Sequence, residues 1–159
     1  MEKQFKTVAV GGTFDELHKG HRALLLKAFD VGERVLVGLC SDRLVESFTK
    51  PHVTASYEER LRELRTFLDR HGLLGRAEIV RLDNPFGVML SGDSVEALVV
   101  SKETERVGVK INEERARRGL AAVEIVVVDM VPSEDCLPIS TTRIRVGEID
   151  KEGKLIKRT

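Results

Sequence analysis

The sequence predicts a single α/β domain over residues 1–159, a Rossmann-like, doubly wound sheet of five parallel strands with helices on both faces. Three observations support this fold. The length of 159 residues suits one domain with its own core. Strand-like and helix-like segments alternate along the chain. The strand-like segments are continuous apolar runs, which is typical of parallel strands buried on both faces.

Five apolar runs are the expected strands. Each is short, rich in Val, Ile or Leu, and followed by glycine or polar residues. In chain order they cover residues 6–10, 34–40, 77–82, 97–100 and 124–131. Pro51 disfavours a helix at Lys50, so residues 49–52 are expected to form a loop. Residues 85–90 are expected as a loop or a short helix.

The segments between these runs have apolar residues at helical spacing. Helices are expected over residues 20–29, over a short stretch capped by residues 41–42, from residue 56 to residue 70, over residues 103–118 and over residues 144–149. The clearest begins at Ser56, which has a capping-box spacing to Glu59. Leu64 and Phe67 lie on its apolar face, with Arg and Glu side chains on the other. The helix that Gly119 ends is expected to be a polar surface helix.

Composition argues against several classes of function. Lys and Arg together number 26, as do Asp and Glu, so the net charge is zero and no basic field favours nucleic acid. No apolar run approaches the roughly 18 residues of a membrane span. The amino-terminal residues carry charges and lack the apolar segment of a signal peptide. We therefore expect a cytoplasmic protein that binds neither nucleic acid nor membrane.

Cysteine usage and amide content give two further expectations. Cys40 and Cys136 are far apart and lack the spacing of a zinc site, so we expect them to be reduced. Gln4, Asn84 and Asn112 are the only side-chain amides, and 33% of the residues are charged. That bias resembles the composition of thermophile proteins, in which intracellular disulfides are less unusual.

A glycine- and histidine-containing stretch, GGTFDELHKGH over residues 11–21, follows the first predicted strand and opens the first helix. In an open α/β sheet, ligands bind at the carboxyl ends of the strands. A helix N-terminus there offers free N–H groups and a partial positive charge to a phosphate. The stretch is neither the GxGxxG fingerprint nor a Walker loop, because it lacks their glycine spacing and lysine. It therefore predicts a phosphate site of another kind.

His18 and His21 are three residues apart across the predicted helix start, so both rings can point at one place. The helix N-terminus is expected to lower the pKa of a nearby imidazole, unless a bound anion offsets this. We expect both rings to donate hydrogen bonds to phosphate oxygens. The alternatives are a structural role for one or both rings, or a zinc site that two histidines alone leave incomplete.

Two motifs resemble those of the nucleotidyltransferase superfamily, which transfers a nucleotidyl group from a nucleoside triphosphate. The first is the HxGH element ending at His21. The second is ISTT at residues 139–142, far downstream. With VVSKETERVGVK and TTRIRVGEID, the chain is similar to the archaeal and eukaryotic-type phosphopantetheine adenylyltransferases. The bacterial enzymes of that activity lack the histidine that corresponds to His18.

The resemblance implies one nucleotidyltransferase domain that joins ATP and 4′-phosphopantetheine into dephospho-coenzyme A and pyrophosphate, a step of coenzyme A biosynthesis. It implies that Thr13 and Lys50 bind the acceptor phosphate. His21 would donate to the α-phosphate, His18 would hold the ATP phosphates, and Arg143 would neutralise the leaving pyrophosphate. The implied catalytic residues are His18, His21, Lys50 and Arg143.

The resemblance also implies a wider ATP site. Its members are two glycines, the two histidines, a lysine after the fourth strand and donors at the start of the last helix: Gly11, Gly12, His18, His21, Lys102, Ser140, Thr141, Thr142 and Arg143. Mg²⁺ would arrive on the ATP phosphates, since no carboxylate cluster suggests a metal cage built by the protein. Asp15 is expected to brace the loop rather than to touch substrate.

Other interpretations stay open at this point. Lys50 could be an ordinary surface lysine, Arg143 could pair with a nearby carboxylate, and Ser140 and Thr141 could only cap a helix. An FMN adenylyltransferase or a glycerol-phosphate cytidylyltransferase carries similar motifs. A nucleotide-binding module without catalysis is the alternative of another class. The sequence does not define the oligomeric state.

Overall fold

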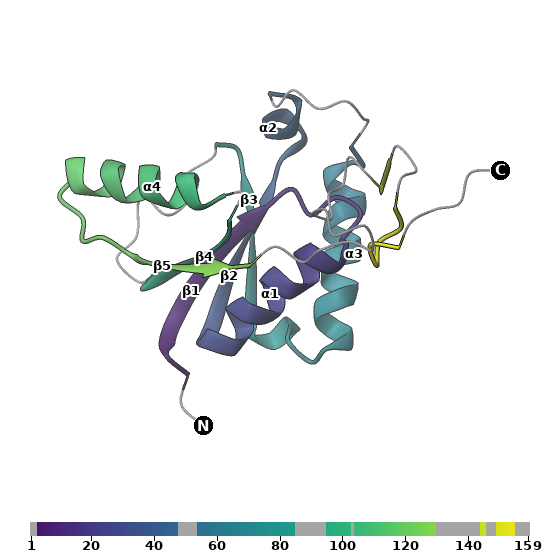
Figure 1. The fold of residues 1–159 in the computed structure, drawn as a ribbon, viewed down its shortest axis with the longest axis horizontal. Helices are drawn as coiled ribbons and strands as arrows, with labels where there is room; N and C mark the ends of the chain where they lie inside the picture. Colours follow the sequence, from purple (N-terminus) through teal and green to yellow (C-terminus); the bar gives the residue numbers. More distant parts are fainter. Residues whose placement is uncertain are drawn as a thin grey trace.

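The computed structural model describes residues 3–47, 54–84, 95–102, 104–129, 144–145 and 149–154. Its centre is a five-stranded sheet in the order β3-β2-β1-β4-β5, in which every neighbouring pair is parallel (Figure 1). The strands are β1 (Phe5–Gly12), β2 (Gly32–Cys40), β3 (Ala77–Leu82), β4 (Ala97–Ser101) and β5 (Glu124–Val128). The predicted doubly wound parallel sheet is confirmed.

The helices begin and end at the residue types expected from the sequence. They are α1 (Lys19–Val31), α2 (Asp42–Glu46), α3 (Tyr57–Arg70) and α4 (Glu105–Arg117), with the 3₁₀ turn η1 (Leu74–Arg76) before β3. The hydroxyls of Ser41 and Ser56 accept backbone N–H groups at the starts of α2 and α3. Gly72 and Gly119, with φ of 67° and 74°, follow the ends of α3 and α4, as C-terminal glycines do.

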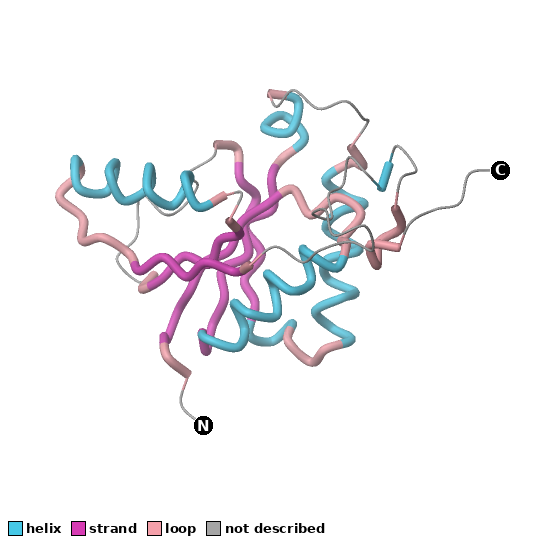
Figure 2. The backbone as a smooth tube through the Cα atoms, viewed as in Figure 1, coloured by secondary structure: helices cyan, strands magenta, loops and turns pink. Residues whose placement is uncertain are grey.

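Helices cover both faces of the sheet, as predicted. α1 and α3 lie on one side of the strands and α4 lies on the other (Figures 1 and 2). The larger core joins Leu25 of α1 and Leu64 of α3 to Val10 and Val37 of the central strands. The smaller core joins Ile111 of α4 to the residues that alternate with those, such as Leu98. This alternation explains why the strands are apolar along their whole length.

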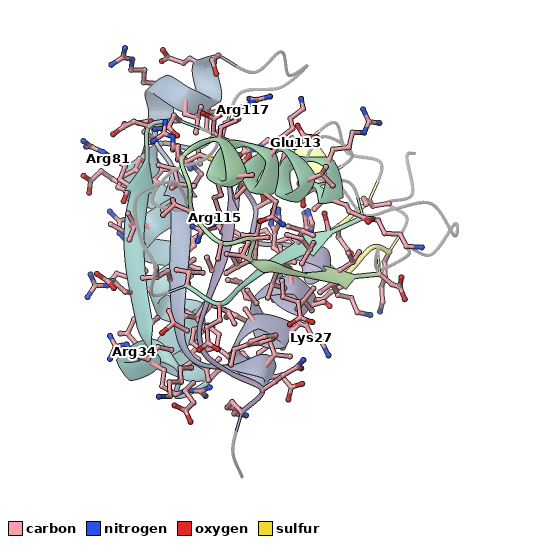
Figure 3. The ribbon with its side chains drawn as sticks, turned by 90° about the vertical axis from the view of Figure 1, so that its left-hand side faces the viewer. Lys27, Arg34, Arg81, Glu113, Arg115 and Arg117 are labelled. Carbon is pink, nitrogen blue, oxygen red and sulfur yellow. The ribbon has the colours of Figure 1, made fainter. Side chains whose placement is uncertain are left out.

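The expectation of a polar surface helix is confirmed for the outer face of α4, whereas its inner face buries Ile111 and Arg115. Arg115 is only 2% exposed, and its Nε donates to the Ala121 carbonyl at 2.8 Å. Figure 3 labels Arg115 beside the strands that α4 covers. The buried Arg115 side chain therefore binds a backbone carbonyl just beyond the end of α4 instead of extending into solvent.

Some predicted elements lie partly or wholly outside the described residues. The predicted loop at residues 49–52 and the segment at 85–90 lie wholly outside them. The last strand is described to Val128, and Asp129 is no longer in it. Of the predicted final helix, the described residues Ile144 and Arg145 are helical. No helix in the described part of the chain is long and apolar enough to cross a membrane.

The strand order reverses its direction of growth next to β1, which has β2 on one side and β4 on the other. Such a switch point, at the carboxyl ends of the strands, is where open α/β sheets bind ligands. β1 continues in parallel pairing with β2 as far as Gly12, opposite Leu39. The stretch that carries the two histidines therefore starts at the switch point.

Candidate active site

The loop that leaves β1 has an unusual backbone. Phe14, Glu16 and Leu17 have φ of 51°, 64° and 27°, although none is glycine. Such conformations cost free energy for residues with a side chain and persist only where surrounding contacts hold them. The Phe14 side chain is fully buried in the larger core and anchors the loop. The left-handed loop therefore turns the chain from the strand end into the start of α1.

His18 is the N-cap of α1, and its ring lies against the ring of His21. The His18 Nδ1 accepts a hydrogen bond from the His21 backbone N–H at 3.2 Å. The two ring centroids are 3.7 Å apart with 15° between the planes, and the Phe14 ring meets His21 edge-on at 5.4 Å. Because Nδ1 is an acceptor, the neutral His18 ring carries its proton on Nε2. The sequence-based expectation that both rings come to one place is confirmed.

The pKa of His18 is lowered from 6.5 to about 4. Burial is the largest cause, since only 6% of the residue is exposed, and the positive charge of Arg22 is the second. We expected a lowered pKa but ascribed it to the helix N-terminus, and burial is the larger cause. His18 is thus neutral at pH 7 in the free protein and can donate through Nε2.

Gly20, between the two histidines, makes room for the His18 ring. A Cβ built on Gly20 would lie 2.9 Å from Cε1 and 3.1 Å from Nδ1 of His18. Contacts this close force one of the groups to move. Gly12 is similar, because its Cβ would lie 3.3 Å from the Phe14 ring. These glycines therefore serve close packing within the loop.

We expect Gly20→Ala to lower kcat/KM by roughly tenfold or more, because the displaced His18 ring leaves the geometry that it shares with His21. Its thermal midpoint is expected to change little, since alanine favours a helix over glycine by up to about 1 kcal/mol. Steady-state kinetics and a thermal melt measure the two effects. Gly75→Ala is the matched control, because no atom lies within 4 Å of a Cβ there. A Gly20→Ala variant with wild-type kcat/KM would contradict this account.

Asp15 is fully buried and is held by two segments. Its carboxylate accepts two hydrogen bonds from Arg145, from Nε at 2.7 Å and from Nη2 at 2.8 Å, in a bidentate pair. It also accepts the Ala55 backbone N–H at 3.2 Å. Hydrogen bonding to Asp15 raises the pKa of Arg145 above its ordinary value. These contacts agree with the expected bracing role of Asp15.

The carboxy-terminal segment is attached to the same loop. Arg145 Nη2 lies 3.0 Å from a carboxylate oxygen of Glu16, and Lys151 Nζ lies 3.5 Å from the other. The Lys19 backbone N–H donates to the Lys151 carbonyl at 2.9 Å, and Arg22 pairs with Glu152. Residues close to the two sequence motifs are therefore in direct contact in the fold.

The structure describes six of the predicted site residues. Five of them lie within residues 11–21, which run from the end of β1 into the first turn of α1: Gly11, Gly12, Thr13, His18 and His21. Lys102 comes just after β4, the strand that pairs with β1, with Nζ 3.6 Å from the Asp129 carboxylate and its side chain 63% exposed. The other five predicted residues lie outside the described part of the chain: Lys50, Ser140, Thr141, Thr142 and Arg143.

Two arginines at this site were missed by the sequence analysis. Arg145 follows the predicted Arg143 by two residues, and nothing in the local pattern distinguishes them. Arg60 is fully buried under the loop. Its position did carry a signal, because it precedes Leu64 by four residues and so shares the apolar face of α3. A cation on an apolar face indicates a specific buried partner.

Comparisons with known proteins agree with this geometry. The cytidylyltransferase-like family matches residues 9–147. The phosphopantetheine adenylyltransferase of Methanothermobacter thermautotrophicus is 43% identical over 99% of this chain and 94% of its own length. That of Methanopyrus kandleri is 43% identical over 93% of each.

Among solved structures, a protein of unknown function from Archaeoglobus fulgidus matches with a TM-score of 0.70 and 35% identity, over 79% of this chain and 90% of that one. The sequence-based resemblance is thereby confirmed on both fold and sequence. This chain belongs to the cytidylyltransferase-like family of nucleotidyltransferases and, within it, is a relative of the archaeal phosphopantetheine adenylyltransferases.

Proposed function

We propose that this protein transfers the adenylyl group of ATP to 4′-phosphopantetheine, giving dephospho-coenzyme A and pyrophosphate. The observation that carries the proposal is the stacked His18–His21 pair at the start of α1, in a chain 43% identical to a phosphopantetheine adenylyltransferase over nearly its whole length. The pair lies at the sheet's switch point, where a phosphate-bearing ligand also meets the N-terminus of a helix.

In this reaction an oxygen of the acceptor phosphate attacks the α-phosphorus of ATP. The bond from that phosphorus to the β-phosphate oxygen breaks, and its electron pair leaves with pyrophosphate. The acceptor is already anionic at neutral pH, so no general base has to remove a proton. Catalysis then depends on positioning and on donors that meet the growing negative charge.

The chain's own groups suit that requirement. The Nδ1 atom of the neutral His18 ring accepts the His21 backbone N–H, which leaves Nε2–H to donate to an ATP phosphate. We assign His21 to the α-phosphate and Thr13 to the acceptor phosphate. Asp15 is the carboxylate nearest in sequence to Thr13. It is hydrogen-bonded to Arg145 and is assigned a bracing role rather than that of a base.

The remaining roles rest on the family resemblance. Lys50 would orient the acceptor phosphate, and Arg143 would neutralise the pyrophosphate. Ser140, Thr141 and Thr142 would bind the β- and γ-phosphates. Lys102 would contribute to the nucleotide wall. A cytoplasmic location stays a prediction of the same proposal.

Mg²⁺ is proposed to be bound by the phosphate oxygens of ATP and by water, where it would neutralise phosphate charge. The donor set fits an ion brought by the nucleotide. In the described ranges, no three His, Cys, Asp or Glu side chains are grouped to hold a metal. The two carboxylates of the loop, Asp15 and Glu16, are already paired with Arg145.

The direct test measures pyrophosphate release with a panel of substrate pairs. ATP with 4′-phosphopantetheine should turn over at least 100-fold faster than ATP with FMN or CTP with glycerol phosphate. Faster turnover of either other pair would assign a different reaction of the superfamily. ATP binding without turnover on any acceptor would identify a non-catalytic binding module.

Replacing Ser140 and Thr141 together with alanine is expected to weaken ATP binding roughly tenfold or more and to leave 4′-phosphopantetheine binding nearly unchanged. The reason is that their hydroxyls are assigned to the ATP phosphates alone. Calorimetric titration of the variant with each ligand separately measures both affinities. Equal losses for the two ligands would mean that the ATP and acceptor sites are assigned wrongly.

A further inference from the structure

We propose that Arg60 is a positioning residue for the acceptor phosphate, acting through the backbone of Thr13, which it joins to Cys40, Asp42 and Ala55. The proposal rests on the proposed function, because that function assigns Thr13 and Lys50 to the acceptor. It adds a residue that never touches substrate. Arg60 lies in the first turn of α3, and its side chain is fully buried.

The guanidinium of Arg60 joins four backbone or side-chain groups from three parts of the chain. Its Nη1 donates to the Thr13 carbonyl at 3.0 Å and to the Cys40 carbonyl, at the end of β2, at 2.7 Å. Its Nε donates to the Ala55 carbonyl at 2.9 Å, and its Nη2 donates to the Asp42 carboxylate at 3.0 Å. The partners of Arg60 therefore surround it in several directions.

This arrangement needs an arginine in particular. The planar guanidinium presents its N–H groups in a fixed fork, whereas a lysine ammonium is a single point with three donors. Within the described residues, the one charged partner is Asp42, whose side chain is 55% exposed, so carbonyl groups supply the rest of the stabilisation. A buried cation held mainly by backbone carbonyls fixes the positions of those carbonyls in return.

The fixed carbonyls belong to the places that handle the acceptor. The Thr13 carbonyl belongs to the peptide unit that precedes Phe14, the first left-handed residue of the loop. Asp42 and Ala55 come before and after the Lys50 segment in the chain. The Ala55 N–H also donates to Asp15, so Ala55 contacts the loop directly as well as through Arg60. Arg60 thus fixes the Thr13 peptide relative to Ala55 and Asp42.

Among the described residues, the hydrogen bonds of Arg60 do not go to His18, His21 or the carboxy-terminal segment, which Arg60 reaches only indirectly, through Ala55 and Asp15. His18 and His21 are held by the start of α1 and by the loop, and Lys151 and Glu152 contact α1 from the carboxy-terminal segment. Loosening Arg60 should therefore disturb binding of the acceptor far more than binding of ATP. Replacing an arginine that only stabilises the fold would lower stability without affecting the two substrates differently.

The experiment compares Arg60→Lys with Arg115→Lys by steady-state kinetics and thermal melts. Arg115 is the matched control, because it is also buried and also donates to a carbonyl, but it lies under α4 on the other face of the sheet. Arg60→Lys should raise the KM for 4′-phosphopantetheine roughly tenfold or more and leave the KM for ATP within about twofold. Arg115→Lys should lower the thermal midpoint and change neither KM.

Unchanged KM values in folded Arg60→Lys, or equal increases for both substrates, would overturn the proposal. If Arg60→Lys does not fold, Asp42→Ala takes its place, since it removes one of the four partners and leaves the arginine. That variant should raise the KM for 4′-phosphopantetheine selectively by a smaller factor, roughly threefold. No increase in its KM for 4′-phosphopantetheine would overturn the proposal as well.

Thr13→Val separates this inference from the proposed function. It removes the hydroxyl but keeps the carbonyl that Arg60 holds, and it should raise the same KM. If Thr13→Val leaves that KM unchanged, the assignment of Thr13 is wrong and the inference is overturned with it. If Thr13→Val raises the KM and Arg60→Lys does not, only the inference about Arg60 is wrong.

Discussion

Replacing His21 with alanine is expected to lower turnover by roughly 100-fold or more, with a much smaller effect on ATP affinity. A donor that meets charge developing in the transition state lowers the barrier more than it strengthens ground-state binding. The substitution should leave the local fold intact, because the His21 backbone N–H, rather than its ring, makes the cap contact with His18. What is lost is the ring that stacks on His18 and meets Phe14.

Single-turnover kinetics and calorimetric titration with ATP measure the two effects separately. His71→Ala is the matched control, since this histidine lies at the end of α3 and contacts Phe67 rather than the loop. Its turnover should equal that of the wild type. An unchanged turnover number in a folded His21→Ala protein would show that the ring has no part in the chemistry.

We expect the unfolding free energy of the free protein to fall by about 3 kcal/mol between about pH 6.5 and about pH 4, because of His18. The sign follows from the lowered pKa. Between pH 6.5 and pH 4 the unfolded chain takes up a proton on this ring and the folded protein does not, so acid favours unfolding. A difference of 6.5 minus 4 is about 2.5 pKa units, and each unit is worth about 1.4 kcal/mol. Above about pH 6.5 this ring is neutral in both states, so the loss of unfolding free energy is absent there.

Urea unfolding of the wild type and of His18→Asn, from pH 7.5 to pH 4, isolates this contribution from that of the carboxylates. Asparagine cannot titrate, but its side-chain oxygen still caps a helix well. The wild type should lose about 3 kcal/mol more than the variant over this range. Parallel pH profiles for the two proteins would mean that the buried ring is not neutral in the folded state.

The architecture was largely predictable because each strand is a separate apolar run between polar residues. The bounds of β3, Ala77–Leu82, match the prediction. β1 extends past its apolar residues through Gly11 and Gly12, because parallel pairing with β2 continues there whatever the side chains are. The ends of such strands are determined by the neighbouring strand, which a local pattern cannot show.

The site was predictable in its residue types but not in its internal support. HxGH indicated a shared position for two rings, and the structure places them in a stack. The sequence analysis gave Gly20 no role, and the structure shows that it makes room for the ring of His18. The contacts from Arg60 and Arg145 join residues far apart in sequence, and they arise only once the chain is folded.

The attachment of residues 145–152 to the first loop also determines when the site can exist during synthesis. A ribosome delivers the loop long before the residues that brace it, since Arg145 follows its partner Asp15 by 130 residues in the chain. Until then Asp15 and Glu16 lack Arg145 and Lys151, so the left-handed turn has only part of its support. The nascent domain can pack β1 to β4 beforehand. We therefore expect the nascent domain to become competent to bind nucleotide only after Arg145 and Lys151 have been synthesised.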